Sequence, residues 1–170
     1  MNLHLPRVGK LSAKEICALS IIGALVFASK LALASLPNIH INCVLIILTA
    51  VFFSWKALYS VFVYIMLEGL VFGFGIWWLS YLYIWPLFTA AAVMLRKNDS
   101  AAIWAVLAGI FGLCFGALCS VPYLFTGGAE MALSYWVSGI PFDLLHCAGN
   151  FITTLILYKP LYKTIKKILK

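Results

Sequence analysis

Charged side chains are scarce in this sequence of 170 residues: they make up 10% of it, and only five of them are acidic. Hydrophobic residues make up 65%, and the mean hydropathy is +1.07. Soluble domains carry about 25% charged and about 50% apolar residues. The shortage of charge excludes an ordinary soluble domain, and the composition predicts an integral membrane protein.

Patterns that indicate other kinds of protein are also missing. Strands of about ten residues with alternating polarity, which build membrane β-barrels, are absent, so the spanning elements must be helices. The five cysteines form no CxxC pair, which argues against a disulfide framework or a zinc site. Neither a Walker A loop nor an HExxH motif occurs. If the protein moves a solute against a gradient, the energy comes from an ion or from another subunit.

Six apolar segments follow one another along the chain. They cover residues 16–36, 39–53, 57–74, 76–95, 101–125 and 140–157. Most approach the roughly 20 residues that a spanning helix needs, whereas the second segment is short. We predict an all-α integral membrane protein, a six-transmembrane-helix bundle that forms a single transmembrane domain over residues 1–170.

Eleven of the twelve Lys and Arg residues lie outside these segments, at both chain ends and at every second connection. They are Arg7, Lys10, Lys14, Lys56, Arg96, Lys97, Lys159, Lys163, Lys166, Lys167 and Lys170. The other connections, residues 36–40, 74–76 and 120–139, carry none. The positive-inside rule therefore places both termini in the cytoplasm. The formal net charge of +7 reports orientation and contact with anionic lipid rather than nucleic-acid binding.

An N-terminal signal peptide is an alternative use of the first segment. Ala32-x-Ala34 before Ser35 imitates a cleavage site. Lys30 interrupts the apolar stretch, however, and removal of this helix would leave the new N-terminus outside. We therefore expect the first segment to remain in the mature protein.

Lys30 is the one basic residue inside an apolar segment, and Glu68, Asp143 and His146 are ionisable residues inside others. At a rise of about 1.5 Å per residue, Lys30 and Glu68 lie roughly 9 Å below the outer ends of their predicted helices, level with His146. Asp143, His146 and Asn150 share one helical face. Charges inside a membrane are expensive and need partners. Two interpretations stay open: a polar ligand pocket in the outer half, or a Lys30–Glu68 ion pair with Asp143 capping the last helix.

Aromatic residues gather on the same side of the predicted bundle. Tyr81 and Trp85 share a helical face, and Trp78 precedes them. Tyr123 and Trp136 lie within the connection of residues 120–139. Anchoring at the membrane surface explains many such residues, but a face of this kind also suits a flat, partly polar ligand. The connection of residues 120–139 is long enough to act as a lid.

Small residues recur at every fourth position of the first segment. They are Ser20, Ala24, Ala28 and Ala32. Such a smooth stripe lets a second helix approach closely, either within the bundle or from a partner subunit. Gly112 and Gly116 form a similar pair, which we expect to serve packing within the bundle.

Several stretches of the sequence together resemble one known family. They are Leu36-Pro37-Asn38-Ile39-His40, Leu67-Glu68-Gly69-Leu70, Gly73-Phe74 with Trp77-Trp78, Tyr81-Leu82-Tyr83-Ile84-Trp85, and Gly139-Ile140-Pro141-Phe142-Asp143 with His146 and Asn150-Phe151. Over nearly the whole chain, and in size and predicted topology, the sequence is similar to the substrate-binding S components of energy-coupling factor (ECF) transporters.

The resemblance implies an importer subunit in a prokaryotic plasma membrane that captures a vitamin or a related small organic micronutrient from outside. Its partners would be a transmembrane coupling (T) subunit and two cytoplasmic ATPase subunits, so the chain itself would not be an enzyme. Ala24, Ala28 and Ala32 match the family's docking surface for the coupling subunit. The resemblance implies no cofactor, and it implies contact with membrane lipid and not with nucleic acid.

The resemblance also places the ligand beneath the outer connections. The candidate substrate-binding residues are Lys30, Asn38, His40, Glu68, Trp78, Tyr81, Trp85, Tyr123, Trp136, Asp143, His146 and Asn150. One subgroup of the family takes up cobalt or nickel through an N-terminal Met-His start, whereas this chain begins Met1-Asn2-Leu3-His4. We therefore expect an organic ligand and no metal site.

Two other classes of function stay open. Glu68, Asp143 and His146 could serve an intramembrane enzyme as acid, base or metal ligands, which requires at least two of them to converge. A membrane scaffold or assembly protein without a small ligand would instead be a bundle that lacks an outer cavity.

Overall fold

The computed structural model describes residues 11–35 and 39–168, and all regular structure in this part of the chain is helical. In chain order the elements are α1 (Ala13–Ala32), α2 (Asn42–Phe53), the 3₁₀ turn η1 (Ser54–Lys56), α3 (Ala57–Phe72), α4 (Ile76–Met94) and α5 (Ala101–Ile168). The predicted all-α class is confirmed. The candidate residue Asn38 and the basic residues Arg7, Lys10 and Lys170 lie outside the described residues.

Four helical stretches in the described residues are long and apolar enough to cross a membrane. They are Ala13–Ala32, Asn42–Phe72, Ile76–Met94 and Ala101–Ile168. The second is interrupted at Ser54, where φ is 55° and ψ is −137°, and the chain turns back between α2 and α3. The fourth is interrupted at Gly128, where φ is 76° and ψ is −174°. Gly128 adopts this positive φ at little cost because it has no Cβ.

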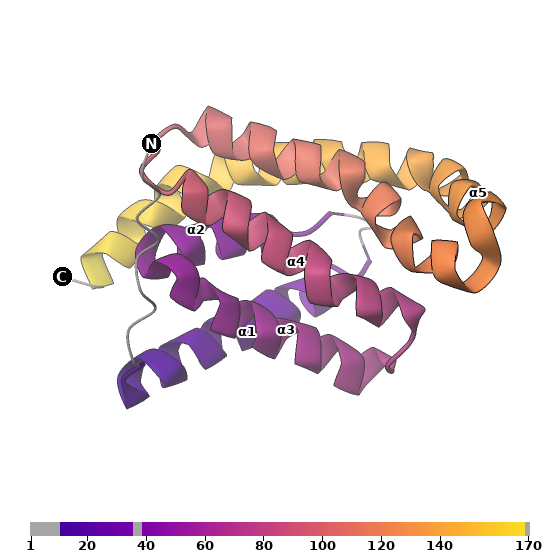
Figure 1. The fold of residues 1–170 in the computed structure, drawn as a ribbon. Coiled ribbons are helices and arrows are strands. Elements are labelled where there is room, and N and C mark those ends of the chain that lie inside the picture. Colours follow the sequence, from indigo (N-terminus) through magenta and orange to yellow (C-terminus); the bar gives the residue numbers. More distant parts are fainter. Residues whose placement is uncertain (1–10, 36–38, 169–170) are drawn as a thin grey trace, which may run out of the picture.

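Gly128 divides α5 into two limbs, residues 101–127 and 129–168, which lie antiparallel and side by side in Figure 1. Their backbones approach closely at two glycines. A Cβ added at Gly112 would lie 2.7 Å from the carbonyl of His146, and one added at Gly116 would lie 2.4 Å from Oδ2 of Asp143. As expected, Gly112 and Gly116 serve packing within the bundle.

Three predicted features differ from the structure. α1 ends at Ala32 instead of Leu36, so Lys30 lies in its last turn rather than deep within it. The connection of residues 120–139, which is long enough for a lid, is not an open loop but is helical on both sides of Gly128, because a single residue with positive φ suffices to turn the chain. α5 also continues past Leu157 to Ile168, since cationic side chains favour the last turns of a helix even where hydropathy falls.

α2 forms the centre of the bundle. Most of its 12 residues are buried, and it packs against α1, α3, α4 and α5, while α1 packs mainly on α3. A helix that is apolar all round is stable only where other elements surround it. The central position explains why the second apolar segment of the sequence is short.

Basic residues gather at one end of the bundle, which we call the basic end. Lys56 of η1 pairs with Glu15 in the first turn of α1, Nζ to Oε1, at 2.5 Å, and Phe52 stacks on Tyr162 near the end of α5. Figure 1 places the α4–α5 connection at this end too. The described residues concerned are Lys14, Lys56, Arg96, Lys97, Lys159, Lys163, Lys166 and Lys167. Lys30, the α3–α4 turn and Gly128 lie at the opposite end.

Candidate ligand-binding site

Lys30 and Glu68 form an ion pair at the end of the bundle opposite the basic end. Lys30 Nζ lies 2.6 Å from Glu68 Oε2, and the exposed fraction of the side chain is 24% for Lys30 and 0% for Glu68. The ammonium also lies 5.3 Å from the ring centroid of Phe72 and 5.6 Å from that of Tyr81. The carboxylate and the two electron-rich ring faces together replace the water that the cation would otherwise keep.

Helix ends position this pair. Lys30 lies in the last turn of α1, where its charge also interacts favourably with the negative end of the helix dipole. Glu68 lies one turn before Gly73, which ends α3 with φ of 89°. The pair borders a cavity of about 260 Å³ that is also lined by Phe72, Trp77 and Tyr81.

A second cavity, of about 310 Å³, lies between the two limbs of α5. Residues of both limbs line it: Phe115, Gly116, Cys119, Tyr135, Ser138, Gly139, Phe142, Asp143 and His146. Its volume is at the lower end of the range of about 300 to 1,000 Å³ that is usual for small-molecule sites. We call it the Asp143 cavity, and the first one the Lys30–Glu68 cavity.

Asp143 is held by the opposite limb. Its Oδ1 accepts a hydrogen bond of 2.9 Å from the backbone N–H of Gly116, while Oδ2 is buried without a hydrogen-bond partner. Gly116 allows this approach because any Cβ would overlap the carboxylate. The alternative role of Asp143 as the cap of the last helix is wrong, since the helix begins well before Asp143, which instead bridges the limbs.

Aromatic rings separate the two cavities. Tyr81 of the Lys30–Glu68 cavity contacts Phe115 of the Asp143 cavity edge to face, with centroids 6.1 Å apart. On the other side of Phe115 lies His146, at 4.9 Å, and His40 packs edge-on against His146 at 5.9 Å. Burial, and secondarily the charge of Lys30, lower the pKa of the His40 imidazole, which lies between the first two candidate spans. His40 is therefore neutral at pH 7.

The structure thus brings some of the predicted residues together and leaves others apart. Lys30, Glu68 and Tyr81 share one cavity, and Asp143 and His146 share the other. Tyr123 is one ring removed from the Asp143 cavity, since it stacks on Tyr135 with centroids 4.4 Å apart. Asn150 is buried in α5 and both polar atoms of its side chain lack a partner.

Besides Tyr123, three predicted aromatic residues line neither cavity. Trp78 packs across α3 and α4 and donates from Nε1 to the carbonyl of Ile65 at 2.9 Å. Trp85 is buried in an aromatic cluster with Tyr64 and Phe111. Trp136 has an exposed fraction of 41%. The spacing in the sequence placed Tyr81 and Trp85 on one face of the helix. In the structure the rings of Tyr64 and Phe111 cover Trp85, so that only Tyr81 reaches a cavity.

The structure adds a buried polar chain that the prediction missed. Ser29 Oγ donates to Asn42 Oδ1 at 3.1 Å, and Asn42 Nδ2 donates to the hydroxyl of Tyr64 at 3.2 Å. This chain links α1, α2 and α3 close to the Lys30–Glu68 pair, since Ser29 immediately precedes Lys30 and Tyr64 lies one turn before Glu68. An asparagine in an otherwise apolar segment was the signal available in the sequence.

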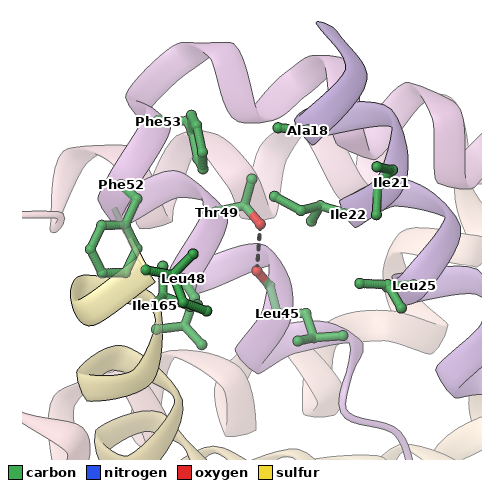
Figure 2. A pocket seen from close by; sticks show the side chains of 11 residues that line it. Ala18, Ile21, Ile22, Leu25, Leu45, Leu48, Thr49, Phe52, Phe53 and Ile165 are labelled. Carbon is green, nitrogen blue, oxygen red and sulfur yellow. Dashed lines mark hydrogen bonds between the residues drawn. The ribbon is translucent and has the colours of Figure 1, made fainter. Parts of the chain in front are cut away.

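A third hollow, of about 460 Å³, lies towards the basic end between α1, α2 and the last turn of α5 (Figure 2). Its lining is apolar except for Thr49, whose hydroxyl donates to the carbonyl of Leu45 at 2.7 Å. With that hydroxyl satisfied, no free polar group is present to orient a polar ligand. This hollow is therefore not part of the candidate site.

The small-residue stripe of α1 faces outwards. Ala24, Ala28 and Ala32 are exposed, whereas Gly23 and Val26 face the bundle. The stripe is thus not used for packing within this chain.

No three His, Cys, Asp or Glu side chains gather as a set of metal ligands anywhere in residues 11–35 and 39–168. Comparison with profiles of protein families, with curated proteins and with solved structures gives no match. The resemblance to ECF S components therefore stays a prediction from the sequence pattern.

Proposed function

We propose that this protein is the substrate-binding S component of an ECF-type importer and that it captures a vitamin or a related small organic micronutrient from outside the cell. One observation carries the proposal: two adjoining cavities, one beside the Lys30–Glu68 pair and one beside the buried Asp143, are formed by residues away from the basic end. A bundle that served as a scaffold has no need of an expensive buried ion pair beside a cavity.

The orientation follows from the positive-inside rule. With the basic end in the cytoplasm, both termini are cytoplasmic and the two cavities open towards the outside. In this arrangement α1, α2, α3, α4 and the two limbs of α5 make six passes through the plasma membrane. The breaks at Ser54 and Gly128 support this count, and α2, with 12 residues, is a short pass enclosed by the others.

The partners are a transmembrane coupling subunit and two cytoplasmic ATPase subunits. The exposed stripe of Ala24, Ala28 and Ala32 supports a docking surface on α1, because small side chains let another helix approach the backbone. Substrate delivered through this complex would be driven by ATP hydrolysis in the partners.

The alternative of an intramembrane enzyme has less support. It requires at least two of Glu68, Asp143 and His146 to converge with a nucleophile or a metal ion. Asp143 and His146 do share one cavity, but Glu68 lines the other one, and the described residues hold no set of three metal ligands. Glu68 is also paired with Lys30, so it is not a free acid or base.

The test is capture followed by transport. The full-length protein, purified gently in detergent, should carry a small organic molecule that native mass spectrometry detects without added ATP. Co-expression with a coupling module should then give ATP-dependent uptake of that molecule. Glu68→Ala should reduce its occupancy far more than Glu130→Ala, because Glu130 is exposed. If the purified protein carries no bound molecule and the co-expressed complex takes none up, the proposal of an importer subunit is rejected.

A further inference from the structure

The Asp143 cavity contains a buried carboxyl group that forms no ion pair with the described residues. Among the five acidic residues, Glu68 and Glu15 pair with Lys30 and Lys56. Asp99 and Glu130 are exposed. Asp143 is 5% exposed and has no cationic partner among the described residues. Burial of an unpaired carboxylate is costly, so a cationic or hydrogen-bond-donating group that contacts Asp143 would stabilise it.

The remaining walls supply no cationic side chain of Lys or Arg to Asp143. From the first limb of α5 the cavity is lined by Phe115, Gly116 and Cys119. From the second limb it is lined by Tyr135, Ser138, Gly139, Phe142 and His146, and His40 packs behind His146. None of these is Lys or Arg. The two imidazoles pack edge to face with centroids 5.9 Å apart, so a charge on one disfavours a charge on the other.

The free oxygen of Asp143 is available to a ligand. Oδ1 is engaged by the Gly116 amide at 2.9 Å, and Oδ2 has no partner. The aromatic faces of Phe115 and Tyr135 are further attractive surfaces for a flat cation. On the other side of the Phe115–Tyr81 contact, the charges of Lys30 and Glu68 cancel. The combined site therefore carries the charge of Asp143 alone.

We infer that the Asp143 cavity binds the cationic, N–H-donating end of an organic ligand, such as an amidinium, guanidinium or protonated aminoheterocycle, and discriminates against carboxylates and phosphates. This assignment rests on the proposed function for its biological context and names the chemical class of that substrate. It does not depend on the coupling subunits.

Three probes of nearly equal shape test the charge directly: benzamidine, benzamide and benzoate, which at pH 7 are a cation, a neutral amide and an anion. Binding to the purified full-length protein is measured by calorimetry. Benzamidine should bind at least about tenfold more tightly than benzamide, since hydrogen bonds to charged groups contribute more than neutral ones, and benzoate should bind weakest. Equal binding of benzamidine and benzamide would mean that Asp143 carries a proton, and it would overturn the inference. Preference for benzoate, or binding of none of the three, would overturn it as well.

Variants tie the preference to Asp143. Asp143→Asn should abolish the preference for benzamidine over benzamide, whereas the matched change Glu130→Gln at an exposed carboxylate should leave it unchanged. Gly116→Ala offers a second route, because it displaces the carboxylate without removing its charge, and Gly109→Ala, where a Cβ has ordinary contacts of 3.4 to 3.6 Å, is its control. A preference that survives both Asp143→Asn and Gly116→Ala would place the cation elsewhere.

The two proposals fail in different ways. A co-purified anion, identified by native mass spectrometry and taken up with a coupling module, would overturn the charge assignment and leave the importer intact. A cation preference that depends on Asp143, without uptake in the presence of a coupling module, would leave the cavity assignment intact and count against the importer.

Discussion

Lys30 and Glu68 are 38 positions apart in the chain, yet the ammonium of the first lies 2.6 Å from a carboxylate oxygen of the second. The comparable pair at the basic end, Lys56 with Glu15, has a similar distance of 2.5 Å and a lysine of equal exposure, 24%. The carboxylates differ: Glu68 is fully buried, whereas the side chain of Glu15 is 31% exposed. Loss of the lysine should therefore lower the free energy of unfolding more for the Lys30–Glu68 pair than for the Lys56–Glu15 pair.

Lys30→Met should lower the free energy of unfolding by about 3 kcal/mol, because it leaves the buried carboxylate of Glu68 without a counter-charge. Lys56→Met should lower the free energy of unfolding much less, since water screens the charge of Glu15. Thermal unfolding in the same detergent compares the two variants. The double variant Lys30→Met with Glu68→Leu should recover much of the loss, because no charge remains buried. Equal losses for Lys30→Met and Lys56→Met would contradict this account.

Gly112→Ala should destabilise the protein by about 1 to 3 kcal/mol, because overpacking forces backbones apart. A Cβ at Gly112 would lie 2.7 to 2.8 Å from backbone atoms of His146 and Cys147, which cannot rotate away. Gly109→Ala, one turn earlier on the same limb of α5, should be neutral or slightly stabilising, since its Cβ meets only ordinary contacts. Unfolding in detergent measures both, and a neutral Gly112→Ala would refute the close approach of the limbs.

Tyr83→Phe should lower the stability by about 1 to 3 kcal/mol, because it leaves a carbonyl without a donor. The helical partner of the Leu118 carbonyl would be the N–H at position 122, but Pro122 has none. The hydroxyl of Tyr83 donates to this carbonyl instead, at 2.5 Å. Tyr59→Phe removes a hydroxyl from a ring that is 49% exposed and serves as the control. Equal melting temperatures of the two variants would show that the bond does not matter.

Ala28→Leu should abolish uptake while leaving ligand capture unchanged, because it adds a bulky side chain to the exposed stripe of α1 and Ala28 lines neither cavity. Ala148→Leu places the same side chain at an exposed position of α5 and should leave both functions intact. Uptake into cells that carry a coupling module, together with native mass spectrometry of the purified variants, separates the two effects. Normal uptake by the Ala28→Leu variant would contradict the proposal that the coupling subunit docks on this face of α1.

Much of the site could be predicted residue by residue, but its division into two cavities could not. Glu68, Asp143 and His146 were recognisable because ionisable residues in apolar segments need partners. Which partner each one finds depends on helix rotation and on contacts across the bundle. Lys30 reaches Glu68, whereas Asp143 reaches the backbone of Gly116 on another limb. The Lys30–Glu68 pair was one of the two interpretations that the sequence left open, because both residues lie at a similar predicted depth, and the structure shows it. The contact of Asp143 with Gly116 was not predicted, because spacing within a helix does not show which limbs touch.

Helix ends show the same limit. The apolar segment extended the first helix to Leu36, but α1 ends at Ala32, and Lys30 consequently lies in its last turn. The connection of residues 120–139 had too little hydropathy to indicate a span, yet it is helical apart from Gly128. Hydropathy measures the preference for lipid, and helix formation depends on backbone hydrogen bonds that polar and small residues also complete.

The sequence by itself determined the class of the protein: an apolar, charge-poor chain must satisfy its backbone within helices, and basic residues at every second connection assign them to one side. Tertiary structure alone decided which buried charges are neutralised. Coulomb attraction and hydrogen bonding act over a few ångströms, so their outcome depends on which helices touch. Contact between α1 and α3 cancels the charges of Lys30 and Glu68 and leaves Asp143 as the charge that a ligand would meet.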